Sequence, residues 1–404
     1  MKIETRNLVD KDVRRAIKLA DLLKKKSFFL FGPRGIGKSY LIRQELLSPR
    51  SETVVLLDLL DSRVFTRLSM SASNLEGIVK GNLGNQKVVP EKVWVVIDEI
   101  QKIPVLLDEV HRLIELYGWR FLLTGSSSRK LKRSGTNLLA GRARSIQLHP
   151  LCFDEIKAEG FDIERRLLYG ALPFVYFAKE PEQELLAYRN LYIKEEIKEE
   201  ALCRSIPKFT KFMEGAALCS GNLINFEKIG RDYAIPASTV REYYSILEET
   251  FIGFMLEPWT HSKKRKAISK SKFYLFDLGV FHSFMETKAL SKHTDLFGRS
   301  VEHLIIQELR AYVEYKLISL KLGYWKSVNR QEVDLTVGEE IAIEIKSTEK
   351  ISSKHLRGLK ALREENVFRH FYLISFDPIA MVQEGVQCLH CVEFLKRLWD
   401  GQII

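Results

Sequence analysis

The sequence has little cysteine and no hydrophobic run long enough to cross a bilayer. Five cysteines in 404 residues are an odd number without framework spacing, which excludes a disulfide-stapled scaffold and favours a reducing compartment. No uncharged stretch approaches the roughly 18–20 apolar residues of a membrane span. The first residues, 1–5, lack the basic-then-apolar order of a secretory signal. We therefore expect a soluble, cytoplasmic protein without a membrane partner.

A second possible role for cysteine is also weak. Cys388 and Cys391 flank His390 and could form half of a zinc site, but the sequence holds no second pair. Val386, Val392 and Phe394 surround them with apolar side chains. We expect these cysteines to belong to the core.

Low-complexity composition is absent as well. With 46% hydrophobic and 28% charged residues, the composition excludes a disordered chain. At roughly 150 residues per domain, the length predicts two or three domains. Lys and Arg number 63 against 52 Asp and Glu, and the net charge of +11 suggests a polyanionic partner.

The residue pattern changes twice along the chain. The first third alternates helical segments with five strand-like segments, at 27–31, 53–58, 93–97, 120–123 and 145–148. This alternation predicts an α/β core with a parallel sheet covered on both faces. From about 184 to 259 the pattern is helical. After a basic run come a strand at 273–276 and then elements in the order αβββαβ. We predict domains at 1–185, 186–290 and 291–404.

A phosphate-binding motif lies directly after the first strand. Gly32-Pro-Arg-Gly-Ile-Gly37-Lys38-Ser39 fits G-x-x-x-x-G-K-[ST] and precedes a helical segment. In such a loop the backbone amides turn toward the phosphates, Lys38 reaches the β and γ oxygens, and Ser39 offers a hydroxyl to Mg²⁺. The residues expected to bind ATP are Gly32, Pro33, Arg34, Gly35, Ile36, Gly37, Lys38, Ser39 and Tyr40.

Two carboxylates follow a later strand. Val93-Trp-Val-Val-Ile-Asp98-Glu99 is an apolar strand with paired acidic residues at its end, which packing alone does not explain. The pattern is typical of a Walker B motif. Asp98 is expected to hold Mg²⁺, and Glu99 to orient and polarise the attacking water, so hydrolysis of ATP is predicted.

Several motifs together resemble a known family. Besides the phosphate loop, they are Ile97-Asp-Glu-Ile-Gln101, Leu123-Thr-Gly-Ser-Ser127, Leu139-Ala-Gly-Arg142 and Leu148-His-Pro-Leu151. The chain resembles bacterial and archaeal AAA-type ATPases with a C-terminal domain of unknown function, which are similar to STAND-type signalling ATPases. The resemblance implies a polar γ-phosphate sensor, Thr124 or Ser126. It also makes Arg142 a candidate arginine finger, in cis or from a neighbouring subunit, and so permits a homo-oligomer; an ordinary surface arginine is the alternative.

The middle segment predicts a helix-turn-helix. Two apolar stripes, over 226–233 and 240–247, flank a turn at Ile235-Pro236, and the segment resembles an all-α winged-helix module. It would either read DNA or serve as an architectural module. A basic run follows and is the best electrostatic candidate for nucleic acid, with a solvated loop or wing as the alternative. Its members are Lys263, Lys264, Arg265, Lys266, Lys270 and Lys272.

The last segment carries a carboxylate and lysine pattern. If residues 338–340 form a hairpin loop, Val337 pairs with Ile341, and Asp334 then lies opposite Glu344 on the face that also carries Lys346. Asp and Glu in this arrangement suit Mg²⁺, and the lysine suits activation of water at a phosphodiester.

A nearby helix adds a further acidic residue. Glu302 lies on the apolar stripe of the helix predicted at 300–315, where a carboxylate needs a partner or a metal. With the αβββαβ order, the segment resembles the PD-(D/E)XK nucleases, and the domain is expected to be restriction-endonuclease-like α+β. Val333 replaces the family's proline. We expect an ATPase coupled to a nucleic-acid-binding, metal-dependent nuclease domain; the alternative is a switch or scaffold that binds protein or DNA without cutting.

Overall fold

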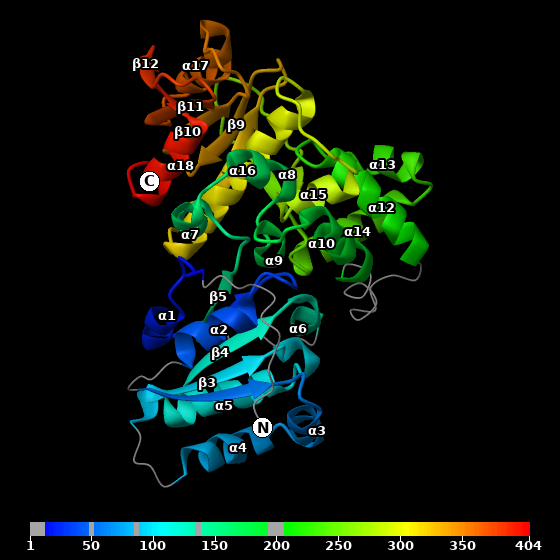
Figure 1. The fold of residues 1–404 in the computed structure, drawn as a ribbon, viewed down its shortest axis with the longest axis vertical. Coiled ribbons are helices and arrows are strands. Elements are labelled where there is room, and N and C mark those ends of the chain that lie inside the picture. The colour runs from blue at the N-terminus through cyan, green and yellow to red at the C-terminus, as the bar shows by residue number, and fades with distance from the viewer. Residues whose placement is uncertain (1–12, 48–51, 85–88, 134–138, 140, 193–205) are drawn as a thin grey trace. The chain divides into compact units, whose positions relative to one another are not determined.

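The computed structural model describes residues 13–47, 52–84, 89–133, 139, 141–192 and 206–404 (Figure 1). These residues form two compact units. The N-terminal unit comprises residues 15–149 and 249–252, and the C-terminal unit comprises 13–14, 150–248 and 253–404. Cys203 lies outside the described ranges, as do residues 1–5. Within those ranges, no helix has the length and apolar character needed to cross a membrane.

The N-terminal unit is built on a parallel five-stranded sheet of order β2-β3-β4-β1-β5. Its strands are β1 (Ser27–Phe31), β2 (Thr53–Asp58), β3 (Val93–Asp98), β4 (Arg120–Gly125) and β5 (Ala143–Gln147). Its helices are α1 (Leu19–Lys25), α2 (Lys38–Leu46), α3 (Ser62–Met70), α4 (Asn74–Leu83), η1 (Pro90–Lys92), η2 (Ile100–Lys102), α5 (Leu106–Tyr117) and α6 (Arg129–Arg133). The predicted α/β P-loop core is confirmed.

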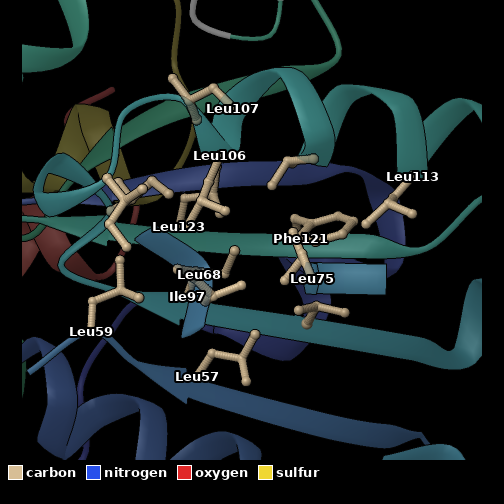
Figure 2. Packing of buried hydrophobic residues seen from close by; sticks show 14 of the residues in the cluster. Leu57, Leu59, Leu68, Leu75, Ile97, Leu106, Leu107, Leu113, Phe121 and Leu123 are labelled. Carbon is tan, nitrogen blue, oxygen red and sulfur yellow. The ribbon is translucent and has the colours of Figure 1, made fainter. Parts of the chain in front are cut away.

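Helices α3, α4 and α5 pack against one face of this sheet. Alternate strand residues such as Leu57, Ile97 and Phe121 point to the face covered by α3, α4 and α5 (Figure 2). The helices contribute Leu68, Leu75 and residues of α5 such as Leu106 and Leu113, which recur at helical spacing. Burying each large apolar side chain is worth about 1.5–3 kcal/mol, so this layer fixes the strands whose ends carry the motifs.

The C-terminal unit combines many helices with one mixed eight-stranded sheet of order β12-β13-β11-β10-β9-β8-β6-β7. Its strands are β6 (Gly253–Pro258), β7 (Lys272–Leu275), β8 (Leu322–Lys326), β9 (Glu332–Val337), β10 (Ile341–Ile345), β11 (His370–Ser375), β12 (Met381–Gln383) and β13 (Val386–His390).

The helices of this unit lie before, between and after the strands. They are α7 (Phe153–Ile156), η3 (Lys157–Glu159), α8 (Ile163–Tyr169), α9 (Pro173–Tyr176), α10 (Pro181–Ala187), η4 (Tyr188–Tyr192), α12 (Ile206–Cys219), α13 (Phe226–Asp232), α14 (Ala237–Glu249), α15 (Leu278–Phe284), α16 (Asp295–Tyr315), η5 (Ser353–Leu356), α17 (Arg357–Arg363) and α18 (Cys391–Trp399). The predicted order αβββαβ is present from α16 to β11. Cys388 and Cys391 are buried, as expected for core residues.

Two features of this unit differ from the predicted boundaries of domains and helices. Strands β6 and β7 come from the segment assigned to the winged-helix module, yet β6 pairs in parallel with β8, so one sheet continues across residue 290. Helix α16 begins at Asp295, five residues before the predicted Ser300, because the Thr294 side chain accepts the Phe297 N–H and caps it there. The three-domain division stays a prediction.

Candidate functional site

The phosphate loop connects β1 to α2 in the N-terminal unit. Gly35 and Gly37 have φ values of 76° and 95°, which glycine adopts without strain. Lys38 opens α2, and its Nζ donates to the carbonyl oxygens of Gly32 and Pro33 at 2.6 and 3.2 Å. The loop is therefore wound around the lysine that the motif assigns to phosphate.

The second half of the site lies at the ends of β3 and β4. Asp98 is buried, and the Ser39 Oγ donates to its Oδ2 at 2.8 Å. The Thr124 hydroxyl donates to the other oxygen, Oδ1. Because β4 lies between β1 and β3, the sheet brings the phosphate loop, Asp98 and Thr124 to one edge.

Glu99 has an unusual backbone. Its φ of 62° places it in the left-handed region, which is costly for a residue other than glycine and is found at functional sites. The Glu99 N–H donates to Thr124 Oγ1 at 3.2 Å, so Thr124 joins both acidic residues. The side chain of Glu99 is half-buried at the strand's end.

Gln101 belongs to the site, although the sequence analysis gave it no chemical role. Its Nε2 donates to the Glu99 carboxylate and, at 3.1 Å, to the Ser126 Oγ. The signal available was an amide side chain two residues after the acidic pair. Thr124 and Ser126, which the sequence offered as alternatives, thus occupy different places: one contacts Asp98 and the other contacts Gln101.

Other predicted nucleotide residues lie around this centre. Ile36 is fully buried, whereas Tyr40 is 46% exposed. Arg142 lies directly before β5. It forms an ion pair with Glu115 of α5, with Nε and Oε1 2.5 Å apart. The role of Arg142 as a finger stays a prediction.

In the C-terminal unit, the predicted hairpin register is confirmed. Val337 pairs with Ile341, and Leu335 with Ile343. Lys346 forms ion pairs with Glu344 and with Asp334, whose Oδ2 lies 3.4 Å from Nζ. The Asp334 Oδ2 also accepts the Ile345 N–H at 2.7 Å. The three side chains therefore meet as the sequence predicts.

Glu302 has a partner that the sequence did not reveal. Lys272 of β7 is buried, and its Nζ lies 3.0 Å from Glu302 Oε1 and 2.9 Å from Glu332 Oε1. The Tyr274 hydroxyl donates to Glu302 at 2.6 Å. Lys272 is consequently not available to nucleic acid, which corrects its place in the basic run.

Burial controls the electrostatics of this cluster. It raises the pKa of Glu302, and it raises that of Glu344 well above its usual value, with the Asp334 charge adding to the rise. Burial alone would lower the pKa of Lys346, but Asp334 and Glu344 outweigh it and raise that pKa. The lysine ammonium groups are thereby held charged among the carboxylates.

The carboxylates predicted as metal ligands are paired with lysines. Within the described part of the chain, no three His, Cys, Asp or Glu side chains are grouped so that they could hold a metal ion. Lysines stand beside the carboxylates predicted as ligands, namely Glu302, Asp334 and Glu344. The role of these residues as ligands of Mg²⁺ stays a prediction.

The remaining basic residues divide by exposure. Lys263, Lys264, Lys266 and Lys270 are exposed, whereas Arg265 is only 19% exposed and pairs with Glu364. The loop is anchored by Glu365, which accepts the backbone N–H groups of Lys263 and Lys264 at 2.8 and 3.0 Å. Four exposed lysines thus remain as a candidate polyanion surface.

The two predicted helices of the middle segment are α13 and α14. Val240, Tyr243, Tyr244 and Leu247 of α14 are buried, as their spacing indicates. Arg241, an exposed residue of α14, donates to Glu227 at 3.1 Å and lies over the Phe226 ring. The exposed face of α14 therefore offers no unpaired arginine at this position, and DNA reading stays a prediction.

Comparison with known families supports the nucleotide site of the N-terminal unit. Residues 24–157 match the family model described as AAA domain. Residues 160–291 and 297–392 match two models described as domains of unknown function, DUF8612 and DUF4143. The N-terminal part of the chain is therefore similar to AAA domains.

Individual relatives are distant. An uncharacterized protein of Mycobacterium tuberculosis is 27% identical over 363 residues, covering 86% of this chain and 75% of that protein. One of Methanocaldococcus jannaschii is 25% identical over 385 residues, covering 86% and 81%. Among solved structures, the Walker-type ATPase of Pyrococcus abyssi is 17% identical with a TM-score of 0.45, covering 66% of this chain and 93% of that one. The Aeropyrum pernix ORC1 protein in complex with DNA is 14% identical with a TM-score of 0.30, covering 70% and 95%.

Proposed function

We propose that the N-terminal unit hydrolyses ATP with Mg²⁺ and that the nucleotide state controls binding of nucleic acid by the C-terminal unit. The observation that carries the first part is the connected set of Ser39, Asp98, Thr124 and Glu99. It joins a phosphate loop to two carboxylates through hydroxyl groups, which a purely structural strand end does not need.

The donor set fits the cofactor. A hydroxyl and a carboxylate are oxygen ligands of the kind that Mg²⁺ takes beside phosphate, and Ser39 Oγ and Asp98 Oδ2 lie 2.8 Å apart. These two residues would hold the ion, which would neutralise charge on the phosphate oxygens. Lys38 would exchange its carbonyl contacts for the β and γ oxygens. Glu99, fixed through its backbone by Thr124, would orient the attacking water.

Phosphate release from ATP by the purified full chain tests this proposal. Glu99→Gln should retain ATP binding and lose hydrolysis by about 100-fold or more, because the amide cannot act on the water. Lys38→Ala should lose both binding and hydrolysis. A Glu99→Gln protein that works at the wild-type rate overturns the role of Glu99, and equal rates in all three proteins overturn the ATPase.

A short segment supports the coupling. Residues 249–252 belong to the N-terminal unit, although they continue directly from α14 and into β6. Ser128, four residues after Thr124, donates its N–H to the Glu249 carbonyl at 2.9 Å, and the Phe251 and Phe31 rings stack at 5.3 Å. The end of β1 and the turn after β4 therefore contact residues 249–252, which belong to the same unit.

For the C-terminal unit we propose binding without cutting. What supports this proposal is that lysines pair with the carboxylates that the nuclease hypothesis assigns to the metal. The exposed Lys263, Lys264, Lys266 and Lys270 would supply phosphate contacts.

Two assays separate binding from cutting. Exchanging the four lysines for Met should weaken DNA or RNA binding and flatten its salt dependence. DNA and RNA incubated with Mg²⁺ or Mn²⁺ should stay intact with both wild type and Glu344→Ala. Degradation by wild type that Glu344→Ala abolishes would restore the metal-dependent nuclease.

A further inference from the structure

The Gln101 side chain is confined at the nucleotide site. It is 5% exposed, and it lies against β4, where a Cβ added to Gly125 would stand 2.7 Å from the Gln101 Oε1. The same Cβ would stand 3.3 Å from the Phe31 ring. Glycine at 125 is therefore what leaves room for the amide beside the strand.

The hydrogen bonds of Gln101 orient its amide. Both Nε2 protons are used, one by the Glu99 carboxylate and one by Ser126 Oγ. Within the described residues, Oε1 is buried without a hydrogen-bond partner. Burying the Gln101 Oε1 without a hydrogen bond costs free energy. An apolar side chain could fill the same space without this cost, so packing alone does not explain a glutamine here.

The backbone brings Gln101 to Glu99. The left-handed Glu99 precedes the 3-10 turn η2, in which Lys102 N–H donates to the Glu99 carbonyl at 3.0 Å. This turn lets the Gln101 side chain reach back to a residue only two positions earlier. The left-handed backbone and the contact from Gln101 are thus found at the same residue, Glu99.

We infer that Gln101 is a positioning residue for ATP hydrolysis: its amide fixes the Glu99 carboxylate in the orientation that serves the attacking water and ties it to Ser126. The inference rests on the proposed ATPase activity. Gln101 does not touch the substrate; it acts through Glu99, as a hydrogen-bonded neighbour orients a catalytic group.

The experiment compares Gln101→Met with wild type in steady-state ATP hydrolysis. Methionine keeps the volume of the side chain and removes the donors. We expect kcat to fall about 10- to 100-fold with KM for ATP unchanged, as for loss of an interaction made in the transition state. Asn82→Leu, which exchanges an exposed amide of α4, is the matched control and should keep the wild-type rate.

A double variant separates positioning from a structural effect. In a Glu99→Gln background, Gln101→Met should change the residual rate by less than twofold, because the carboxylate it orients is gone. An equal fall in both backgrounds, a changed KM, or an unchanged kcat in the single variant overturns the inference.

A chain that hydrolyses no ATP would defeat the proposed function, and a second measurement decides the Gln101 contact in that case. Melting temperatures of Gln101→Met, Glu99→Ala and their combination should be non-additive if the two side chains interact. Additive shifts would overturn the contact, whatever the result for hydrolysis.

Discussion

Arg129 forms a buried ion pair with Glu249, a residue 120 positions later in the chain, with Nη1 and Oε2 2.8 Å apart. The Arg129 side chain is 6% exposed and that of Glu249 is 23% exposed. Removing the carboxylate with Glu249→Ala leaves the guanidinium without this partner in a buried place. We expect the N-terminal unit to lose about 1–3 kcal/mol of unfolding free energy, measured by thermal or urea unfolding.

The chain offers a matched control for this change. Arg241 and Glu227 form a similar pair at 3.1 Å, but their side chains are 61% and 65% exposed. Water screens such a pair, so Glu227→Ala should change stability by less than about 0.5 kcal/mol. Equal effects of the two alanine variants would contradict a special role for the 249–252 segment in holding the N-terminal unit together.

Gly125 at the end of β4 should not tolerate a side chain. In Gly125→Ala the methyl group would meet Gln101 Oε1 at 2.7 Å and the Phe31 ring at 3.3 Å, so one of them must move. Overpacking of this kind costs about 1–3 kcal/mol, and displacement of Gln101 should also lower ATP hydrolysis. A lowered melting temperature together with lowered kcat is the expected result.

Gly77 on α4 provides a control for the Gly125 variant. A Cβ at Gly77 has nothing within 4 Å, and the residue is inside a helix. Gly77→Ala should therefore stabilise the unit by about 0.5–1 kcal/mol through helix propensity. If Gly125→Ala were as stable and active as wild type, the close packing of Gln101 against β4 would be wrong.

Local patterns were enough to predict much of this molecule. Apolar runs located all five strands of the N-terminal sheet within two residues at their ends, and the glycine turn after Val337 set the hairpin register. These features depend on neighbouring residues and on the period of the side chains.

Features that depend on distant residues were not predictable from the sequence. Lys272 sits in a lysine-rich run that is typical of a solvated loop, yet it is buried beside Glu302, 30 positions away. The place of residues 249–252 in the N-terminal unit likewise depends on contacts with Ser128 and Arg129. No periodicity encodes such a pairing, because it arises only when separate elements pack.

Two buried histidines should make the C-terminal unit less stable in mild acid, whereas the raised pKa values of Glu302 and Glu344 act in the opposite direction. Burial lowers the pKa of His282 and of His303 from 6.5 to about 3, with the Arg299 charge contributing. Between these values the unfolded chain binds more protons than the folded chain, so the free energy of unfolding falls as the pH drops from about 6.5 toward 3. Above pH 6.5 the two residues have no such effect.

Melting curves of the full chain between pH 7.5 and 4.5 measure this dependence. His303→Gln removes one titrating group and should reduce the slope of melting temperature against pH for the C-terminal unit. His370→Gln, at an exposed position at the start of β11, should leave the slope unchanged. A wild-type slope in His303→Gln would show that its burial does not control the acid response.

Lys272 should contribute more to the free energy of unfolding than any exposed lysine of the basic run. Its side chain is 4% exposed and its Nζ lies 3.0 Å from Glu302 and 2.9 Å from Glu332. Lys272→Met leaves both carboxylates without this charge, which should cost about 3–5 kcal/mol. Lys270→Met, two residues earlier and exposed, should cost less than about 0.5 kcal/mol. Adding Glu302→Gln to Lys272→Met should restore part of the stability, because the unpaired buried charge is removed. A double variant whose loss of stability equals the sum of the two single losses would mean that Lys272 and Glu302 do not interact.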